Sequence, residues 1–206
     1  GDVQVKLGDR FEVGASIVDD RNPVDKFRMA GVNAIARLAD KTFLIAELAQ
    51  TRRELFADSA SQGTLSGNAG RIEFRHASGD LDLNLYAGRA VKDFDNPGSS
   101  LGKGRQEIGG RAAFKVDERT RIKGEMLQTE DIVNGTRRDG ILIAAERTLE
   151  SGIRIEAGVR HARETQPQVA AVNGTDSIPN EVTAARVRVT GDIPGLKDAA
   201  AYVEAE

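Results

Sequence analysis

Few side chains in this sequence have the type and spacing that catalysis requires. The only two histidines, His76 and His161, fall among apolar positions of alternating segments, where an ordinary strand residue is expected rather than a base or ligand. Residues 102–104 (Gly-Lys-Gly) are similar to part of a phosphate-binding loop, but the spacing from Gly98 is one residue short and no Ser or Thr follows the lysine. The sequence therefore predicts no enzymatic activity.

Two acidic pairs are the only candidates for a cation site. Asp19 with Asp20, and Asp93 with Asp95, lie in predicted loops and offer the oxygen ligands that divalent cations prefer. The spacing of an EF-hand is missing, and carboxylates in turns are ordinarily solvated. We expect neither a metal nor a cofactor.

A larger group of charged side chains occupies alternate positions of several segments, with both signs represented. Such side chains can neutralise one another across neighbouring strands. If they surround a water-filled lumen, they also bias which ions or solutes pass. The predicted lumen-lining residues are Arg37, Glu47, Arg71, Glu73, Arg75, Asp82, Glu107, Arg111, Lys115, Glu125, Arg154, Glu156 and Arg160.

Alternation between apolar and polar residues predicts the strands that carry these charges. In residues 81–88, for example, Leu81, Leu83 and Leu85 alternate with Asp82, Asn84 and Tyr86. This period of two is typical of β-strands with one apolar and one polar face. The predicted strands are 3–7, 10–18, 26–38, 42–52, 69–78, 81–91, 105–116, 119–129, 138–147, 153–163, 182–191 and 199–206.

An internal repeat supports the assignment. Residues 31–51 align without a gap to residues 109–129, with six identical positions that include Gly31/Gly109, Thr42/Thr120 and Thr51/Thr129. Each copy consists of a strand, a charged turn and a second strand. The chain is therefore expected to be a single unit, residues 1–206, built of repeated hairpins.

Short and long predicted connections alternate along the chain. The short ones are at 8–9, 39–41, 79–80, 117–118, 148–152 and 193–198, and the long ones at 19–25, 53–68, 92–104, 130–137 and 164–181. In an antiparallel meander every second connection lies at the same end, so one end carries tight turns and the other carries loops. This layout is typical of a transmembrane β-barrel. We therefore predict an all-β fold, an antiparallel up-and-down meander of about 11 to 12 strands that is a segment of such a barrel.

Composition agrees with this prediction and excludes other classes. No apolar run approaches the roughly 18 residues of a transmembrane helix. The net charge of -3 argues against nucleic acid as a partner. Against a barrel, only 4% of residues are aromatic and Trp is absent, so the aromatic girdles are thin. Phe11, Phe43 and Phe114 do lie beside short turns, although the parity of Phe43 turns it toward the polar face.

Several phrases of turn and strand residues resemble the barrel region of large proteobacterial outer-membrane proteins that carry immunoglobulin-like repeat modules. They are residues 93–97 with 104–107, 117–121, 158–165 and 187–197. The resemblance implies an outer-membrane β-barrel, with membrane lipid as a partner and small solutes or ions in the lumen. No terminal strand ending in an aromatic residue is present, so we expect an internal piece of a longer barrel.

Three functions remain open from the sequence. An outer-membrane barrel can serve as a pore or as a membrane anchor for surface modules. The alternative is a soluble envelope β-sandwich that binds ligands through its long loops, because a covered apolar face gives the same alternation. An outer-membrane hydrolase is a distant third, since no convergent Ser, His and acid can be named.

Overall fold

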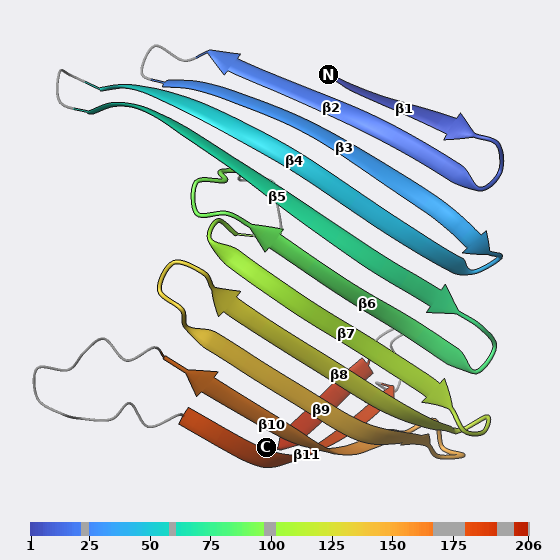
Figure 1. Ribbon diagram of the computed structural model, residues 1–206. Coiled ribbons are helices and arrows are strands. Elements are labelled where there is room, and N and C mark those ends of the chain that lie inside the picture. Colours follow the sequence, from blue (N-terminus) through green and yellow to red (C-terminus); the bar gives the residue numbers. More distant parts are fainter. Residues whose placement is uncertain (22–24, 58–60, 97–101, 167–179, 193–199, 206) are drawn as a thin grey trace, which may run out of the picture. The chain divides into compact units, whose positions relative to one another are not determined.

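The computed structural model describes residues 1–206 apart from 22–24, 58–60, 97–101, 167–179, 193–199 and 206. All regular structure in the described part is β-strand (Figure 1), and no helix there could cross a membrane. The strands are β1 (Asp2–Leu7), β2 (Phe11–Arg21), β3 (Asp25–Ala39), β4 (Thr42–Ala57), β5 (Ser61–Ala77), β6 (Leu81–Ala90), β7 (Arg105–Lys115), β8 (Thr120–Asp131), β9 (Arg137–Thr148), β10 (Arg154–Thr165), β11 (Asn180–Asp192) and β12 (Ala200–Ala205).

Every strand pairs with its neighbours in the chain. The sheet order runs from β1 to β12 without a crossover, and the six strand pairs whose registers are resolved are all antiparallel. This confirms the predicted all-β, up-and-down meander. The sheet is not closed: β1 and β12 are its two edges, and in the described residues neither pairs with the other. Barrel closure therefore stays a proposal.

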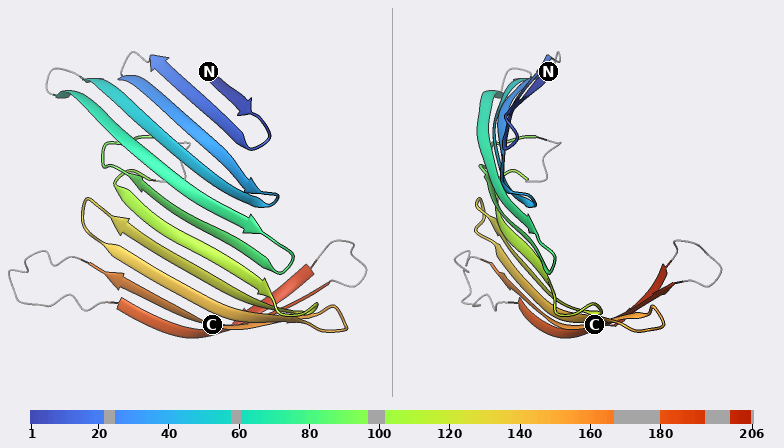
Figure 2. Two further views of the ribbon diagram at one scale, coloured as in Figure 1. Left: turned by 45° about the vertical axis from the view of Figure 1, so that its right-hand side comes forward. Right: turned by 90° about the vertical axis from the view of Figure 1, so that its right-hand side faces the viewer.

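The chain divides into two compact units. The first unit contains residues 1–75, 85–108 and 129–136, and the second contains residues 76–84, 109–128 and 137–206. In the first, β2, β3 and β4 pair over nearly their whole lengths; in the second, β9, β10 and β11 do the same. These long ladders can be followed in both views of Figure 2.

The two copies of the repeat form equivalent hairpins. Residues 31–51 lie on β3 and β4 around the turn at 40–41, and residues 109–129 lie on β7 and β8 around the turn at 116–119. The matching threonines are alike in environment, because Thr51 and Thr129 are both buried. Each copy is thus two strands joined by a turn, and residues 42–52 are strand throughout.

Two of the predicted long connections were wrong. Strand β4 continues to Ala57 and β5 begins at Ser61, so most of residues 53–68 is strand. Likewise β2 extends to Arg21 and β3 begins at Asp25, so within the predicted loop 19–25 all of the described residues belong to strands. The Ser, Gly and Asn residues there suggested loops, yet a ladder of backbone hydrogen bonds can continue through polar residues. The connection at 92–104 is long as predicted, while most of 164–181 lies outside the described residues.

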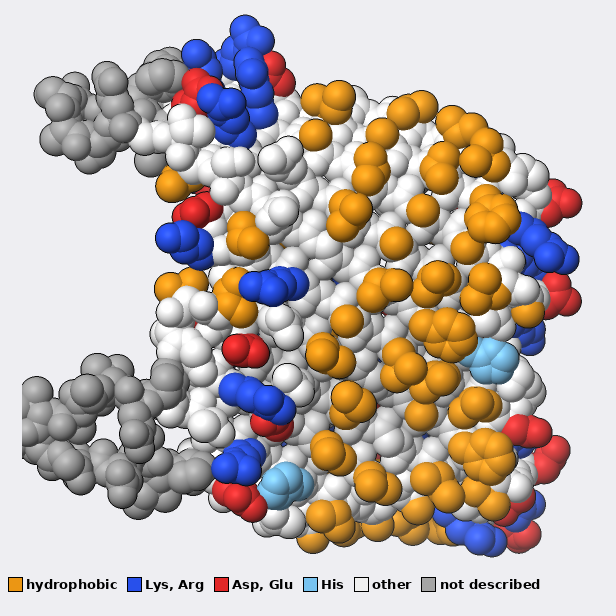
Figure 3. Space-filling view, in the orientation of Figure 1, with side chains coloured by type: hydrophobic (Ala, Val, Ile, Leu, Met, Phe, Trp, Pro, Cys, Tyr) orange, Lys and Arg blue, Asp and Glu red, His pale blue; other side chains and the backbone are white. Residues whose placement is uncertain are grey.

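Each unit has one apolar and one polar face. Residues directly opposite in an antiparallel register share a face, and in the first unit Val3, Ala15, Val32 and Leu48 form one such row. In the second unit Ile143, Val159 and Ala185 form another. Figure 3 shows that hydrophobic side chains cover the middle of the viewed face along the strands, and that charged side chains gather near the strand ends. We call this the apolar face and its reverse the polar face.

Candidate functional site: the polar face

The polar face of the first unit carries the predicted residues Arg37 and Glu47. Arg37 lies opposite Phe43, and Glu47 lies opposite Asn33, which in turn lies opposite Gly14. Phe43 therefore shares the polar face with Arg37, as the repeat predicted. Near the turn the face also contains the Ile35 and Ile45 pair, so it is mixed rather than wholly charged.

Glu73 is the centre of the strongest cluster in the first unit. Its side chain is nearly buried, and its carboxylate accepts hydrogen bonds from Arg75 Nε and from Arg71 Nη2 at 3.4 Å. All three residues lie on β5 at alternate positions, so the zigzag of one strand places a cation on each side of one acid. A buried carboxylate requires such partners, because its desolvation is costly when they are missing.

The cluster extends across β6 to β7. The hydroxyl of Tyr86 donates to Glu107 Oε1 at 2.8 Å, and the guanidinium of Arg71 lies 4.3 Å from the centre of the Tyr86 ring. Arg105 Nη2 is 3.4 Å from Glu107 Oε2. The predicted residues Arg71, Glu73, Arg75 and Glu107 are therefore brought together, with Tyr86 as the link between strands.

Lys123 organises the polar face of the second unit. Its ammonium group donates to Glu146 Oε2 at 2.6 Å and to Glu156 Oε2 at 2.8 Å. Glu146 and Glu156 lie directly opposite each other on β9 and β10, and Glu156 faces Arg188 of β11 on its other side. The sequence predicted Glu156 as a lumen-lining residue but missed Lys123 and Glu146, although both occupy polar alternate positions.

The other predicted residues lie at polar-face positions of their own strands. Lys115 Nζ is 3.8 Å from Glu118 Oε1 at the β7–β8 turn. Arg154 lies opposite Thr148 and Thr190, and Arg160 lies opposite Leu142 and Ala184. The remaining three alternate with apolar neighbours on β6, β7 and β8: Asp82, Arg111 and Glu125.

A folded-back segment on the polar face of the first unit was not predicted. After β6 the chain turns, and Phe94 packs against Ala90, Ala49 and Ala69 with only 2% of its surface exposed. A Cβ atom at Gly67 would lie 2.1 Å from Phe94 N, so only glycine leaves room for this approach. In the right-hand view of Figure 2 this green segment stands on one side of the first unit's strands. We call residues 91–96 the inward segment.

Two polar contacts fix the inward segment to β3 and β4. The backbone N–H of Asp95 donates to Thr51 Oγ1 at 3.1 Å, which explains why Thr51 is buried. Arg53 Nη1 donates to Asp95 Oδ2 at 2.6 Å, while its Nε donates to Asp25 Oδ2 at 2.9 Å. One guanidinium thus joins two carboxylates from different parts of the chain. The signal available in the sequence was the small residues at 49, 67, 69 and 90, all on polar-face parity.

A hollow of the first unit lies over the apolar face. It has a volume of about 850 Å³, and its lining includes two successive register rows of that face, Ala15, Val32 and Leu48 and then Ile17, Ala30 and Gln50. The hollow therefore belongs to the apolar face and lies among its exposed apolar side chains.

Metal-ligand side chains and the two histidine candidates were the remaining predicted features. Within the described part of the chain no three His, Asp or Glu side chains are grouped so that they could hold a metal ion. His161 Nδ1 is 2.9 Å from Thr183 Oγ1, its neighbour across the β10–β11 pair. Asp19 contacts Arg21 and Arg28, so it is an ion-pair partner.

Comparisons with known proteins identified no relative. No family model matches the chain, and neither a curated protein nor a solved structure is significantly similar to it. Its function must therefore be argued from the two faces themselves.

Proposed function

We propose that this chain forms part of the wall of a bacterial outer-membrane β-barrel, with the apolar face toward lipid and the polar face toward a water-filled interior. The barrel serves as a pore or as a membrane anchor for surface modules. Its partners are membrane lipid and, in the interior, small solutes or ions.

The observation that carries this proposal is that burial is inverted. Large apolar side chains of the apolar face are exposed in both units: Leu48 to 63% and Ile143 to 62%. The buried residues among those described lie on the polar face and include Thr51, Glu73 and Thr129. In a water-soluble protein large apolar residues are instead buried, and extended apolar patches are rare. A bilayer removes the conflict, because it covers the apolar face.

Strand length supports the same proposal. The strands from β2 to β11 contain between 10 residues in β6 and 17 residues in β5, whereas strands of soluble proteins average about 5 to 6. A ten-residue strand rises roughly 33 Å, and at a tilt of about 40° it spans roughly 25 Å, the height of an apolar band in the outer membrane. The residues beyond that height in β4 and β5 then extend into water.

The ion pairs of the polar face are suited to a wet interior. Lys123, Glu146 and Glu156 are partly exposed and bridge three strands. In the first unit both cations beside Glu73 lie on its own strand, and Tyr86 links Arg71 of that strand to Glu107. Such pairs need high-dielectric surroundings or close partners, and here they have both. If the interior conducts, the inward segment narrows it on the side of the first unit.

The deciding experiment compares two adjacent residues of β4 in the complete natural protein. The chain has no cysteine, so Leu48→Cys and Glu47→Cys, made in a cysteine-free background, each give one site for an environment-sensitive fluorophore. In vesicles that contain lipids with a quencher on the acyl chain, we expect strong quenching at position 48 and little at position 47. Equal quenching at both positions would falsify the assignment of faces. No quenching at either position, with the apolar face covered by a second layer of protein, would favour the soluble β-sandwich.

A further inference from the structure

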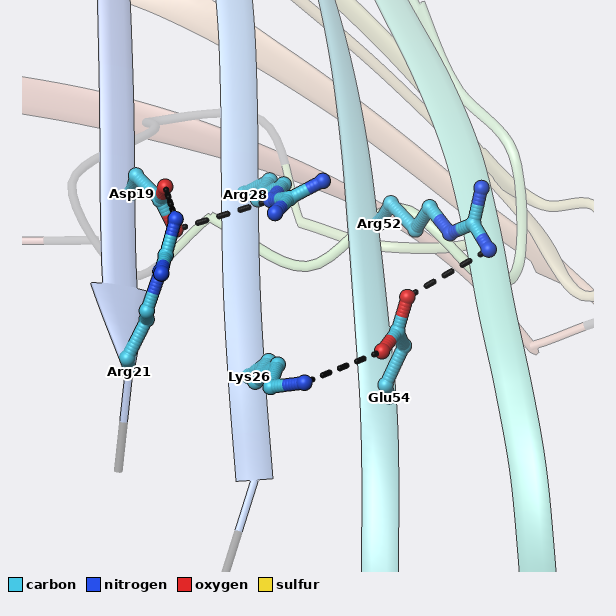
Figure 4. A network of polar contacts seen from close by, with 6 residues as sticks. All are labelled: Asp19, Arg21, Lys26, Arg28, Arg52 and Glu54. Carbon is cyan, nitrogen blue, oxygen red and sulfur yellow. Dashed lines mark hydrogen bonds and ion pairs between the residues drawn. The ribbon is translucent and has the colours of Figure 1, made fainter. Parts of the chain in front are cut away.

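A charged patch ends the apolar face of the first unit, at the ends of β2, β3 and β4 that are remote from the turns at 8–10 and 40–41. In the strand registers Asp19, Arg28 and Arg52 form one row across the three strands. Arg21, Lys26 and Glu54 form the next row. Since the preceding row is Ile17, Ala30 and Gln50, these charges continue the apolar face. Figure 4 shows the six charged residues, which we call the basic patch: Asp19, Arg21, Lys26, Arg28, Arg52 and Glu54.

The basic patch contains more cations than its own acids balance. Asp19 contacts Arg21 at 3.1 Å and Arg28 at 3.5 Å. Glu54 contacts Arg52 at 3.3 Å and Lys26 at 4.0 Å. Four positive and two negative side chains give a net charge of +2, within a chain whose net charge is -3. Each arginine has five N–H donors, and the three guanidinium-bearing side chains are more than half exposed.

The opposite ends of the same strands have no such excess. The turns there contain Asp9, Arg10, Asp40 and Lys41, whose charges sum to zero. Figure 3 shows the difference on the apolar face: Lys and Arg side chains form a group at the upper left, whereas both signs are interspersed at the right-hand edge. Positive charge is therefore concentrated at one end of the apolar face.

We propose that the basic patch binds the phosphate-bearing headgroup of a membrane lipid whose acyl chains lie against the adjoining apolar face. This inference rests on the proposed membrane-spanning function. Guanidinium groups match phosphate oxygens through paired hydrogen bonds, and clusters of Lys and Arg next to an apolar surface bind anionic lipid headgroups. Charged residues at this height are also tolerated, because the cost of a cation on the lipid face falls to about 0 to 1 kcal/mol near the interface.

A lipid fits the surface better than a small free anion does. Beside the patch, Ile17, Val32 and Leu48 present exposed apolar side chains in consecutive rows of the same strands. An inorganic phosphate would use only the charges, whereas a lipid uses the charges and the apolar rows together. The patch also occupies two adjacent register rows on three neighbouring strands, so its cations are close enough together to contact one headgroup.

The test uses matched pairs of charge changes in the complete natural protein in non-ionic detergent micelles. The patch variant Arg28→Gln/Arg52→Gln removes two positive charges, and the control Arg10→Gln/Lys41→Gln removes two from the opposite strand ends. The reverse variant Asp19→Asn/Glu54→Gln raises the charge of the patch by two. Binding of a bis-phosphorylated, acylated glucosamine disaccharide, and of the same lipid without its phosphates, is measured by native mass spectrometry.

We expect the patch variant to lose at least about tenfold in affinity for the phosphorylated lipid, since two charge-assisted contacts are removed. The control should change less than about twofold, and the reverse variant should bind more tightly. The dephosphorylated lipid should bind all four proteins alike. Equal loss in the patch variant and the control, or no loss in either, overturns the proposal. Full competition by millimolar inorganic phosphate also overturns it, because the site then recognises a free anion.

Two further readouts separate this inference from the proposed function. The lipid-quenching experiment at position 48 is repeated on each variant in vesicles of neutral lipid, which reports insertion without any anionic headgroup. If every protein retains quenching and the phosphorylated lipid binds all of them equally, only the proposed lipid-binding role of the basic patch is refuted. Loss of quenching in the unmodified protein defeats the membrane proposal itself. If the patch variant does not insert, the reverse variant still decides, because a phosphorylated lipid that binds it no more tightly than it binds the unmodified protein overturns the proposal.

Discussion

The two polar-face clusters have opposite charge arrangements. In the first unit one acid, Glu73, lies between two arginines of its own strand. In the second unit one base, Lys123, lies between two acids of two other strands, Glu146 and Glu156. The first cluster is set by the zigzag of β5 alone, while the second exists only when β8, β9 and β10 are assembled in the observed register.

The two clusters therefore differ in how much their ion pairs depend on the assembled sheet. Removing Glu73 leaves Arg71 and Arg75 apart along the strand. Arg71 still contacts the ring of Tyr86, and Arg75 still interacts with the carboxylate of Glu47. Removing Lys123 leaves two carboxylates directly opposite each other on paired strands, where like charges are destabilising. The second cluster should therefore matter more for folding than the first.

The largest effect is expected from a cation placed on the apolar face, directly behind the second cluster. Ile155 precedes Glu156 on β10 and belongs to the apolar face. Ile155→Arg should cost about 2 to 4 kcal/mol of stability in lipid vesicles, because it exposes hydrocarbon to a charge. Arg154→Leu, its neighbour on the polar face, is the control and should leave insertion nearly intact. Urea unfolding of the lipid-inserted protein measures both, and equal stability of the two variants would mean that the apolar face does not meet hydrocarbon.

The next largest effect is expected at Lys123. Lys123→Met should destabilise the inserted protein by about 2 kcal/mol, since two partly buried carboxylates lose their shared cation. Adding Glu146→Gln should restore about half of the loss, because the like-charge pair is then removed. The measurement is urea unfolding of the single and double variants. If Glu146→Gln gives no rescue, repulsion between the two carboxylates does not account for the loss of stability in Lys123→Met.

A smaller effect is expected at Glu73. Glu73→Gln should destabilise by about 1 kcal/mol, because the amide still accepts one hydrogen bond from an arginine. Its stability loss should be smaller than that of Lys123→Met in the same urea titration. A larger loss in Glu73→Gln would show that ion pairs within one strand contribute more to stability than ion pairs that join three strands.

If the lumen conducts, variants of the two clusters should shift its ion selectivity in opposite directions. Glu73→Gln removes a negative charge and should favour anions, whereas Lys123→Met removes a positive charge and should favour cations. Reversal potentials across a planar bilayer under a salt gradient measure both shifts. Conductance that is absent in every variant, with insertion intact, would leave the anchor as the function.

The smallest effect concerns the turn between β7 and β8. A hydrogen bond of 2.7 Å from the backbone N–H of Arg119 to Asp117 Oδ1 lowers the pKa of the Asp117 carboxyl below its ordinary value. Because the folded pKa is lowered, the stabilisation is present above the unfolded pKa of about 4 and is lost as the pH falls through the lower folded value. The stability difference between the natural protein and Asp117→Asn should therefore be constant near neutral pH and shrink as the pH falls below the unfolded pKa and through the lower folded one. A difference that grows on acidification would contradict this.

Much of the fold followed from the sequence because side-chain alternation is a local property. The period of two placed Leu83, Ile155 and their neighbours on one face, and Arg154 and Glu156 on the other, before any pairing was known. The repeat placed Phe43 on the polar face against its hydrophobic character. Turn residues located Asp117 and Asp40 within a residue or two, because a tight antiparallel turn restricts its backbone strongly.

Only the tertiary structure decided which charges meet and where the chain folds back. Lys123 contacts Glu146 and Glu156 because two strand registers align them, and alternation within a strand carries no information on register. Phe94 lies against Ala49, Ala69 and Ala90 because three separate strands offer small residues at one place, and no single strand shows this. The length of β4 and β5 was also decided by pairing, because each added pair of backbone hydrogen bonds extends the ladder whatever the side chains are.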